Sequence, residues 1–232
     1  MANQPALEWQ ESIPCSTQFE DSYYSRQNGL AETRHVFLDG NALPRRFESA
    51  DKLMIAELGF GTGLNFLAAW QLWQTVSSNN ARLYFTSFER FPMTKNDMAQ
   101  AISVWPELTL LLERLLSQYT PDGGRYVFDN VELSLIIGDA NQTLSDWRGK
   151  ADAWFLDGFN PKTNPELWNA GLIQQVAAHT VKGGTFATYT AAGHVRRALQ
   201  TNGFQVEKCN GYGHKREMSR GCLLEKREDP SN

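Results

Sequence analysis

Three glycines that alternate along the stretch Ile55–Phe66, I-A-E-L-G-F-G-T-G-L-N-F, are the residues best suited to hold a ligand against the backbone. Apolar residues before Gly59 predict a buried strand, and a helical pattern of apolar residues begins at Leu64. Glycine has no Cβ and tolerates a positive φ, so a ligand can lie directly on the turn between strand and helix. The first turn of the helix adds backbone N–H groups that have no partner within the helix.

A carboxylate, Glu57, stands two residues before the first glycine and decides which ligand suits the turn. The dinucleotide fingerprint is G-x-G-x-x-G, whereas this sequence has E-x-G-x-G-x-G. A negative charge suits pyrophosphate poorly and suits a cationic ligand such as S-adenosylmethionine, which carries an ammonium and a sulfonium. The pattern resembles motif I of the class I methyltransferases, and a glycine turn that binds nothing is the open alternative. The cofactor-binding residues expected from this stretch are Glu57, Gly59, Gly61, Gly63, Asn65 and Phe66.

Two further carboxylates close predicted strands and are expected to contact the same cofactor. Glu89 follows the strand Arg82–Phe88, where folds of this kind hydrogen-bond a ribose. Asp139 follows the strand Val131–Ile137, where methyltransferases commonly hold the adenine amino group. The alternatives are a surface glutamate at a strand end and an aspartate that caps the helix Gln142–Trp147.

The loop Asp157–Pro161, D-G-F-N-P, follows a fourth predicted strand, Ala151–Leu156, and resembles the Asp/Asn-Pro-Pro-aromatic loop of amine N-methyltransferases. Methyl transfer needs a desolvated nucleophile aligned with the methyl group, so most of the catalysis is positioning. We expect Asp157 to accept an amine N–H and to take or orient its proton, and Phe159 to flank the acceptor or the sulfonium. Asp157, Phe159 and Pro161 are the expected catalytic residues, and Asp157 also faces the cofactor; a turn-forming aspartate is the alternative.

Strands and helices that alternate along the chain must position these residues. The pattern predicts an α/β fold with a mostly parallel sheet and helices on both faces. The resemblance to class I methyltransferases implies a Rossmann-like SAM-dependent methyltransferase with a seven-stranded sheet and an antiparallel last strand. Thr33–Leu38 and Leu43–Phe47 are predicted to form an N-terminal hairpin extension. The expected organisation is a cap in residues 1–52, the methyltransferase domain in residues 53–226, and a tail or start of a linker in residues 227–232.

Composition excludes several classes of protein. The chain has 232 residues, 41% of them hydrophobic, and a net charge of −4, which fits a globular domain and not a general polyanion binder. Its cysteines, Cys15, Cys209 and Cys222, are far apart, so neither a metal site nor a disulfide framework is expected. No signal peptide or membrane-spanning run is recognisable, and we expect a cytoplasmic protein.

Basic residues cluster near the end of this acidic chain and could contact an RNA backbone. The expected RNA-binding residues are Arg34, Arg196, Arg197, Lys215 and Arg216. Ordinary solvated charge on a helix and a loop is an alternative of nearly equal weight.

Four stretches that span nearly the whole chain resemble the methyltransferase part of the MnmC family, which modifies the wobble uridine of certain tRNAs. The resemblance implies methylation of 5-aminomethyl-2-thiouridine to the methylaminomethyl form, with S-adenosylmethionine as donor. Many family members carry an additional FAD-dependent oxidoreductase domain, so this chain is expected to be a stand-alone form or a piece of a longer protein. The matching stretches are Asn28–Leu38, Glu57–Phe66, Asp152–Trp168 and Gly211–Met218.

Two other classes of function stay open on the sequence alone. One is a different transferase on the same fold, acting on a small amine or a protein; an aminopropyl transferase would need more carboxylates after Asp157 than the residues Asn160, Lys162 and Asn164 provide. The other is a nucleotide-binding module without catalysis. A dehydrogenase is disfavoured by the glycine spacing.

Overall fold

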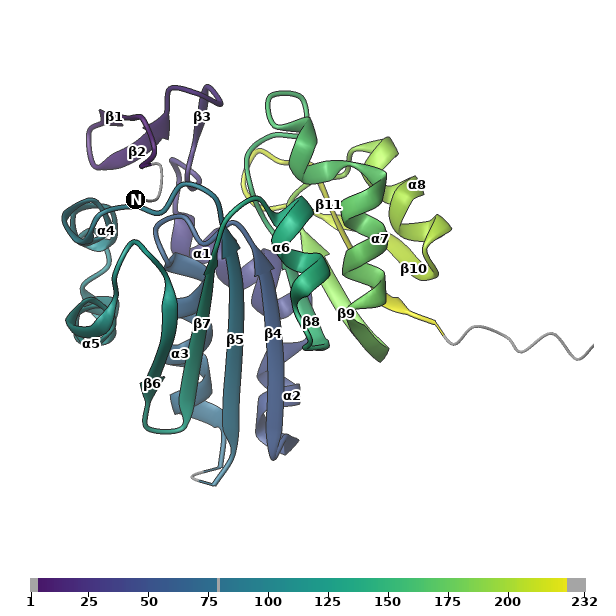
Figure 1. Cartoon of the computed structure of the whole chain (residues 1–232), viewed down its shortest axis with the longest axis horizontal. Coiled ribbons are helices and arrows are strands. Elements are labelled where there is room, and N and C mark those ends of the chain that lie inside the picture. Colours follow the sequence, from purple (N-terminus) through teal and green to yellow (C-terminus); the bar gives the residue numbers. More distant parts are fainter. Residues whose placement is uncertain (1–3, 79, 225–232) are drawn as a thin grey trace, which may run out of the picture.

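A mixed sheet of eight strands, with helices on both faces, forms the centre of the computed structural model, which describes residues 4–78 and 80–224 (Figure 1). In pairing order, its strands are β10 (Phe204–Asn210), β11 (Glu217–Leu223), β9 (Thr180–Thr188), β8 (Ala151–Leu156), β4 (Lys52–Leu58), β5 (Arg82–Glu89), β7 (Val131–Ile137) and β6 (Gly124–Phe128). The five strands from β9 to β7 are parallel, and the other three pair antiparallel. The predicted α/β architecture, a mostly parallel sheet with helices on both faces, is confirmed.

Helices cover the two faces of this sheet. They are α1 (Gly29–Thr33), a π-helix (Arg34–Asp39), α2 (Leu43–Ser49), α3 (Leu64–Val76), α4 (Lys95–Ile102), a 3-10 turn (Pro106–Leu108), α5 (Thr109–Gln118), α6 (Ala140–Asp146), a second 3-10 turn (Pro165–Trp168), α7 (Ala170–Ala178) and α8 (Gly193–Thr201). Figure 1 shows α3 behind the sheet and α6 and α7 in front of it. None of the helices in the described residues is long and apolar enough to cross a membrane.

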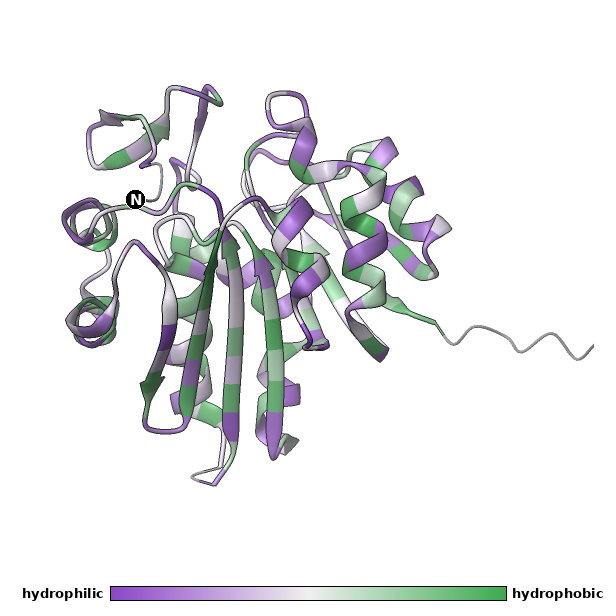
Figure 2. Cartoon of the chain, in the orientation of Figure 1, coloured by the Kyte–Doolittle hydropathy of each residue, from purple (hydrophilic) through white to green (hydrophobic). Residues whose placement is uncertain are grey.

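Two hydrophobic cores lie on opposite faces of the sheet, because successive side chains along a strand point in opposite directions. Ile55 and Phe155 belong to the core under α1 to α5, whereas Ala56 and Trp154 belong to the core under α6 to α8. The central strands are therefore largely apolar on both faces, and Figure 2 shows mostly green and white between the purple ends of β4 and β5. Because both faces of the central strands are covered, a ligand can reach these strands only at the edge where they end.

The carboxyl ends of the parallel strands meet at one edge, and the chain turns there into the predicted site residues. The strand order reverses beside β4, because β5 lies on one side of it and β8 on the other. Ligands of open α/β sheets bind at such a switch point. The small antiparallel sheet of β1 (Leu7–Gln10), β2 (Ile13–Ser16) and β3 (Asp21–Ser22) lies beyond the same edge in Figure 1.

The N-terminal hairpin predicted at Thr33–Leu38 and Leu43–Phe47 is wrong, because these residues are helical. Val36, Phe37 and Leu38 are all buried in succession, which a half-buried strand cannot achieve with its alternating side chains. An antiparallel sheet does occur before the main domain, but in residues 7–22. The helical residues share the core of the large sheet.

The sheet has one more strand than the predicted seven. The additional strand β6 pairs antiparallel with β7 at the edge of the sheet. It is short, begins at the second of two consecutive glycines, and turns only Tyr126 and Phe128 inward, so its apolar pattern is weak. The predicted tail, residues 227–232, lies outside the described residues.

Candidate functional site

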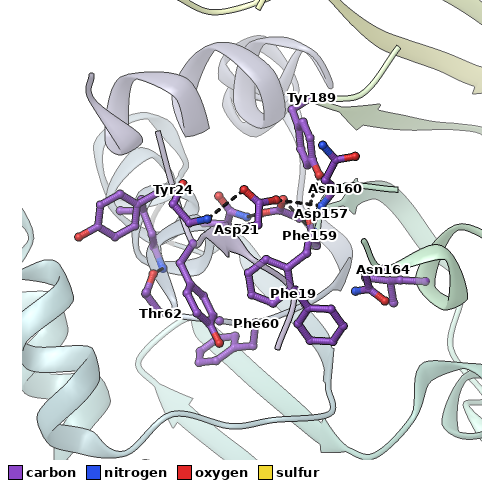
Figure 3. Close-up of a pocket in the computed structure, with 18 of the residues that line it drawn as sticks. Phe19, Asp21, Tyr24, Phe60, Thr62, Asp157, Phe159, Asn160, Asn164 and Tyr189 are labelled. Atoms are coloured by element: carbon purple, nitrogen blue, oxygen red, sulfur yellow. Dashed lines mark hydrogen bonds between the residues drawn. The ribbon is translucent and has the colours of Figure 1, made fainter. Parts of the chain in front are cut away.

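A cavity of about 670 Å³ opens at the carboxyl edge of the parallel strands. Its walls are the glycine turn after β4, the loops after β5, β7 and β8, the N-terminal segment 19–33, and the loop 212–215 between β10 and β11. Figure 3 shows Asp157 together with Tyr189, Phe19 and Phe159 around this cavity. The volume is in the range of sites that hold a cofactor and part of a second substrate.

The glycine turn has the backbone conformation that its sequence predicts. Gly59, Gly61 and Gly63 have φ angles of +82°, +53° and +78°, which side chains rarely tolerate. The Gly59 N–H donates to the Phe88 carbonyl at 2.9 Å, which ties the turn to the end of β5. A Cβ on Gly61 would lie 3.1 Å from the Tyr23 ring, so the N-terminal segment passes close over this turn.

Glu57 lies behind the cavity wall. Its side chain is fully buried, and its two carboxylate oxygens accept hydrogen bonds from Ser87 Oγ at 2.7 Å and from Asn65 Nδ2 at 2.9 Å. Burial raises the pKa of Glu57 well above its ordinary value, against the lowering effect of these two hydrogen bonds. Glu57 therefore acts on the cavity through Asn65.

Asn65 connects Glu57 to the proposed catalytic loop. Its amide nitrogen also donates to Asp157 Oδ2 at 2.7 Å, and its oxygen accepts from the Thr33 hydroxyl at 2.8 Å. Both amide hydrogens and the amide oxygen of this side chain thus have partners. Asn65 is held in one orientation and fixes the Asp157 carboxylate in turn.

Asp157 faces the cavity from the end of β8 and is half-buried. Its other oxygen, Oδ1, accepts the Gly158 N–H at 2.9 Å. Burial raises the pKa of Asp157 to about 6, although the hydrogen bonds from Gly158 and Asn65 lower it. A carboxyl group with this pKa is mostly ionised at neutral pH and can accept a proton.

Glu89 and Asp139 hold the opposite side of the cavity. Glu89 accepts the backbone N–H groups of Gly61 at 2.8 Å and of Phe91 at 2.7 Å, and burial raises its pKa despite these bonds. Asp139 caps α6 by accepting the Asn141 N–H at 2.9 Å, and Arg90 lies 3.3 Å from it. The capping alternative for Asp139 is thus present in the structure, and its carboxylate still lines the cavity.

Aromatic rings from the N-terminal segment close the cavity over the β8 loop. Phe159 stacks on Phe19 with ring centroids 4.7 Å apart and meets the Tyr23 ring edge-on at 4.9 Å. Asp21 accepts the Asn160 N–H at 2.9 Å. The N-terminal segment is therefore attached to the loop that carries Asp157.

Two side chains that sequence reasoning did not single out, Glu32 and Tyr189, complete this end of the cavity. The Lys215 ammonium donates to Glu32 Oε1 at 2.8 Å and lies 4.2 Å from the centroid of the Tyr189 ring. The Tyr189 hydroxyl donates to the Gly158 carbonyl at 2.8 Å, and burial raises the pKa of Tyr189 well above its ordinary value. Tyr189 directly follows β9, so it lies at a strand end as Glu89 and Asp157 do. This position is the feature of the sequence from which Tyr189 could have been predicted.

The sequence of the chain matches that of a known protein family. The profile of a protein family described as S-adenosyl-L-methionine-dependent methyltransferase matches residues 106–223 of the chain. The chain belongs to this family of methyltransferases.

Relatives of the methyltransferase carry a more specific name. This chain is 48% identical over 223 residues to the tRNA 5-methylaminomethyl-2-thiouridine biosynthesis bifunctional protein MnmC of Methylobacillus flagellatus. The aligned region covers 93% of this chain and 34% of the relative. A relative of the same name from Aliivibrio fischeri is 47% identical over 237 residues, and the aligned region covers 95% of this chain and 35% of the relative. The chain thus spans about a third of the length of these curated relatives. The resemblance to the methyltransferase part of the MnmC family is confirmed.

Solved structures agree on the fold of the methyltransferase. A crystal structure of MNMC2 from Aquifex aeolicus superposes with a TM-score of 0.75 at 23% sequence identity, covering 95% of this chain and 71% of that chain. A precorrin-6y C5,15-methyltransferase from Geobacter metallireducens gives a TM-score of 0.52 at 13% identity, covering 93% and 96%.

The cavity of the methyltransferase fits S-adenosylmethionine. A cationic sulfonium and ammonium suit a cavity lined by the carboxylates of Asp21, Glu32, Glu89, Asp139 and Asp157. Gly59 and Gly61 of the glycine turn line the cavity, and without a Cβ they allow a ligand to approach their backbone. Within residues 4–78 and 80–224, no group of His, Cys, Asp and Glu side chains is arranged to hold a metal ion.

The structure brings some of the predicted site residues of the methyltransferase to the cavity and leaves others away from it. Those that line it are Gly59, Gly61, Asn65, Glu89, Asp139, Asp157, Phe159 and Lys215. Those outside its lining are Glu57, Gly63, Phe66, Pro161, Arg34, Arg196, Arg197 and Arg216. Phe66 lies in the hydrophobic core, and Gly63 caps α3. Among the predicted RNA-binding residues, Lys215 donates to Glu32 and Arg34 donates to Gln71 on α3. RNA binding by these basic residues stays a prediction.

Proposed function

We propose that this methyltransferase N-methylates the primary amine of 5-aminomethyl-2-thiouridine at the tRNA wobble position and forms 5-methylaminomethyl-2-thiouridine. The name shared by its relatives supports this substrate. The single observation that carries the proposal is Asp157, a carboxyl group with a pKa of about 6 that Asn65 holds beside the glycine turn. An amine acceptor needs such a group next to the methyl donor.

The cofactor would be held by the turn and by the strand ends. The backbone of Gly59 and Gly61 would lie against it, Glu89 would accept ribose hydroxyl groups, and Asp139 would meet the adenine amino group. Glu57 supports this site through Asn65, and Gly63 and Phe66 shape the helix start behind it. When bound, S-adenosylmethionine would supply an electrophilic methyl group, and the sulfonium sulfur that carried it would become a neutral thioether.

Asp157 would complete the reaction on the acceptor side. An aliphatic amine is mostly protonated at neutral pH, so it must lose a proton before its nitrogen can form the new bond to carbon. Asp157 accepts an N–H of the acceptor, directs the nitrogen lone pair and takes up the released proton, which then passes to solvent. Phe159 and the rings stacked on it exclude water, and Pro161 sets the course of the loop.

RNA and a second enzyme are the proposed partners. We assign RNA backbone contacts to Arg197 and Arg216, which are exposed, and to Arg196, which is half-buried. We place residues 1–52 as a cap that shares the hydrophobic core of the domain 53–226. The relatives are named bifunctional. We therefore propose that an FAD-dependent oxidoreductase, in the same chain or separate, prepares the aminomethyl group.

One observation favours a second function, N-methylation of a small free amine. The N-terminal segment closes over Asp157 through the Asp21–Asn160 and Phe19–Phe159 contacts, which suits a small acceptor. A nucleobase would have to enter beside this cap.

Nucleoside analysis of labelled tRNA tests the proposal. The protein is incubated with S-adenosylmethionine radiolabelled in its methyl group and with tRNA from cells lacking the activity, and the tRNA is digested. We expect label in 5-methylaminomethyl-2-thiouridine, and none when the tRNA lacks the aminomethyl group. Label in another nucleoside would reject the proposed substrate, and label only in added free amines would favour the second function.

A further inference from the structure

An alkylammonium group is already bound inside the cavity, and it belongs to the protein itself. The Lys215 ammonium donates to Glu32 Oε1 at 2.8 Å and lies over the face of the Tyr189 ring at 4.2 Å. A carboxylate and an aromatic face are the two partners that recognise a cationic amine. The group that Lys215 presents is the same chemical group that the proposed acceptor carries.

Glu32 and Tyr189 are held in place without help from Lys215. Glu32 lies in α1, which Asn28 caps by accepting the Ala31 N–H. Its neighbour Thr33 joins the Asn65 hydrogen-bond network that orients Asp157. The Tyr189 hydroxyl is bonded to the Gly158 carbonyl, next to Asp157 in the chain. The ammonium partners and the proposed catalytic carboxylate are therefore built into one framework.

Moving the Lys215 ammonium away from Glu32 without another cation in its place would raise the free energy of the protein. The Glu32 side chain is only 10% exposed, and Lys215 is the side-chain cation paired with it in the described part of the chain. A largely buried carboxylate that loses its partner charge is destabilised. Lys215 itself is 46% exposed and sits in the loop between β10 and β11, so solvent can receive its ammonium. The exchange is favourable only when another cation enters.

We propose that Glu32 and the face of Tyr189 form the subsite for the primary ammonium of the acceptor, and that Lys215 fills this subsite until the acceptor displaces it. This inference rests on the proposed function for the identity of the acceptor. It explains how the enzyme rejects a wobble uridine without an amine, because an uncharged substituent beside Glu32 would leave this largely buried carboxylate without a cationic partner. Glu32 and Tyr189 are specificity-determining residues in this scheme, and Lys215 is a displaceable occupant.

A different role for Lys215 makes the opposite prediction. If Lys215 contacted an RNA phosphate, its loss would weaken every tRNA equally and reduce the dependence of affinity on salt. If Lys215 is an occupant, its loss favours the aminomethyl tRNA over the tRNA that lacks the amine. The ratio of the two affinities separates the roles.

The first experiment measures binding of two tRNAs in the presence of S-adenosylhomocysteine, which prevents turnover. One tRNA carries 5-aminomethyl-2-thiouridine at the wobble position and the other carries 2-thiouridine. We expect Lys215→Ala to raise the affinity ratio in favour of the aminomethyl tRNA by about tenfold, and Glu32→Gln to bring the ratio towards one. Arg216→Ala, one residue away, is the matched control and should change both affinities together. Equal weakening of both tRNAs by Lys215→Ala would overturn the proposal.

The second experiment does not depend on the tRNA substrate. Crystals of Lys215→Ala are soaked with ethylammonium chloride, and the same variant is titrated with ethylammonium by NMR. We expect density between Glu32 and Tyr189, at least tenfold weaker binding by the wild-type protein, and none by the Lys215→Ala, Glu32→Gln double variant. Absence of ethylammonium from Lys215→Ala would reject the subsite even if tRNA is methylated. Its presence, with no methylation of aminomethyl tRNA, would keep the subsite and reject the proposed function.

Discussion

Asp157 carries the chemistry at the scale of single residues because its protonation state and orientation are both set by neighbours. Burial raises its pKa to about 6, and Asn65 and Gly158 each bond one of its oxygens. The side chain also lines the cavity. The side chain is therefore an acceptor whose ionised form predominates only above about pH 6.

The pH dependence of single-turnover methyl transfer should show this ionisation. The carboxylate is the active form, so the rate should fall as pH decreases through about 6 and Asp157 takes up a proton. Asp157→Asn should slow methyl transfer by roughly 10²- to 10⁴-fold, which is the usual contribution of a positioned proton acceptor, and abolish this step in the profile. Calorimetry with S-adenosylmethionine is the control, because cofactor affinity should change far less than the rate. An unaltered rate in this variant would remove Asp157 from the chemistry.

At the scale of elements, the N-terminal segment decides how easily the cavity opens. Asp21 bonds the backbone of Asn160, and Phe19 stacks on Phe159 of the same loop. Asp21→Asn keeps the size of the side chain but weakens a charge-assisted bond to an N–H group. We expect S-adenosylmethionine to dissociate several-fold faster, measured by stopped-flow fluorescence, because the attachment of the segment loosens.

Gln18→Ala is the matched control for that variant, because Gln18 is an exposed residue directly before the segment 19–33. Its dissociation rate should equal that of the wild-type protein. Equal rates for all three proteins would show that the segment does not gate the cofactor.

The sequence predicted the strand ends well because one rule governs them all. Glu89, Asp139 and Asp157 each follow an apolar run, and parallel strands bring their carboxyl ends to one edge. Glu32 could not be found in this way, because its partner Lys215 is 183 residues distant and its own segment was interpreted as the approach to a strand. The burial of Val36 through Leu38 on all sides depends on α2 and α3, which no local pattern reveals.

At the scale of the whole molecule, the N-terminal residues are part of the main core and not a detachable cap. Leu30, Val36, Phe37, Leu43 and Phe47 are each at most 3% exposed and lie in the core cluster of Ile55 and Phe155. At about 2 kcal/mol for each buried side chain, their loss would cost about 10 kcal/mol. This is comparable to the whole stability of a typical domain.

A chain that starts at residue 53 should therefore fail to fold, whereas a chain that starts at residue 28 keeps the helices and loses only the small sheet and the segment over the cavity. Urea unfolding followed by circular dichroism distinguishes the two. We expect a cooperative transition for the longer chain and none for the shorter one. A cooperative transition in the shorter chain would show that residues 53 onward form an independent domain.

The pairing of Glu32 with Lys215 also determines the order in which parts of the site can form during synthesis of the chain. The ribosome makes Glu32 early and Lys215 after nearly all of the sheet, and β11 must insert between β9 and β10 before the loop that carries Lys215 is in place. A nascent chain can form the glycine turn and the strand ends well before it can form the acceptor end of the cavity. The charge-paired resting state, with Lys215 on Glu32, is thus the last part of the site to form during synthesis.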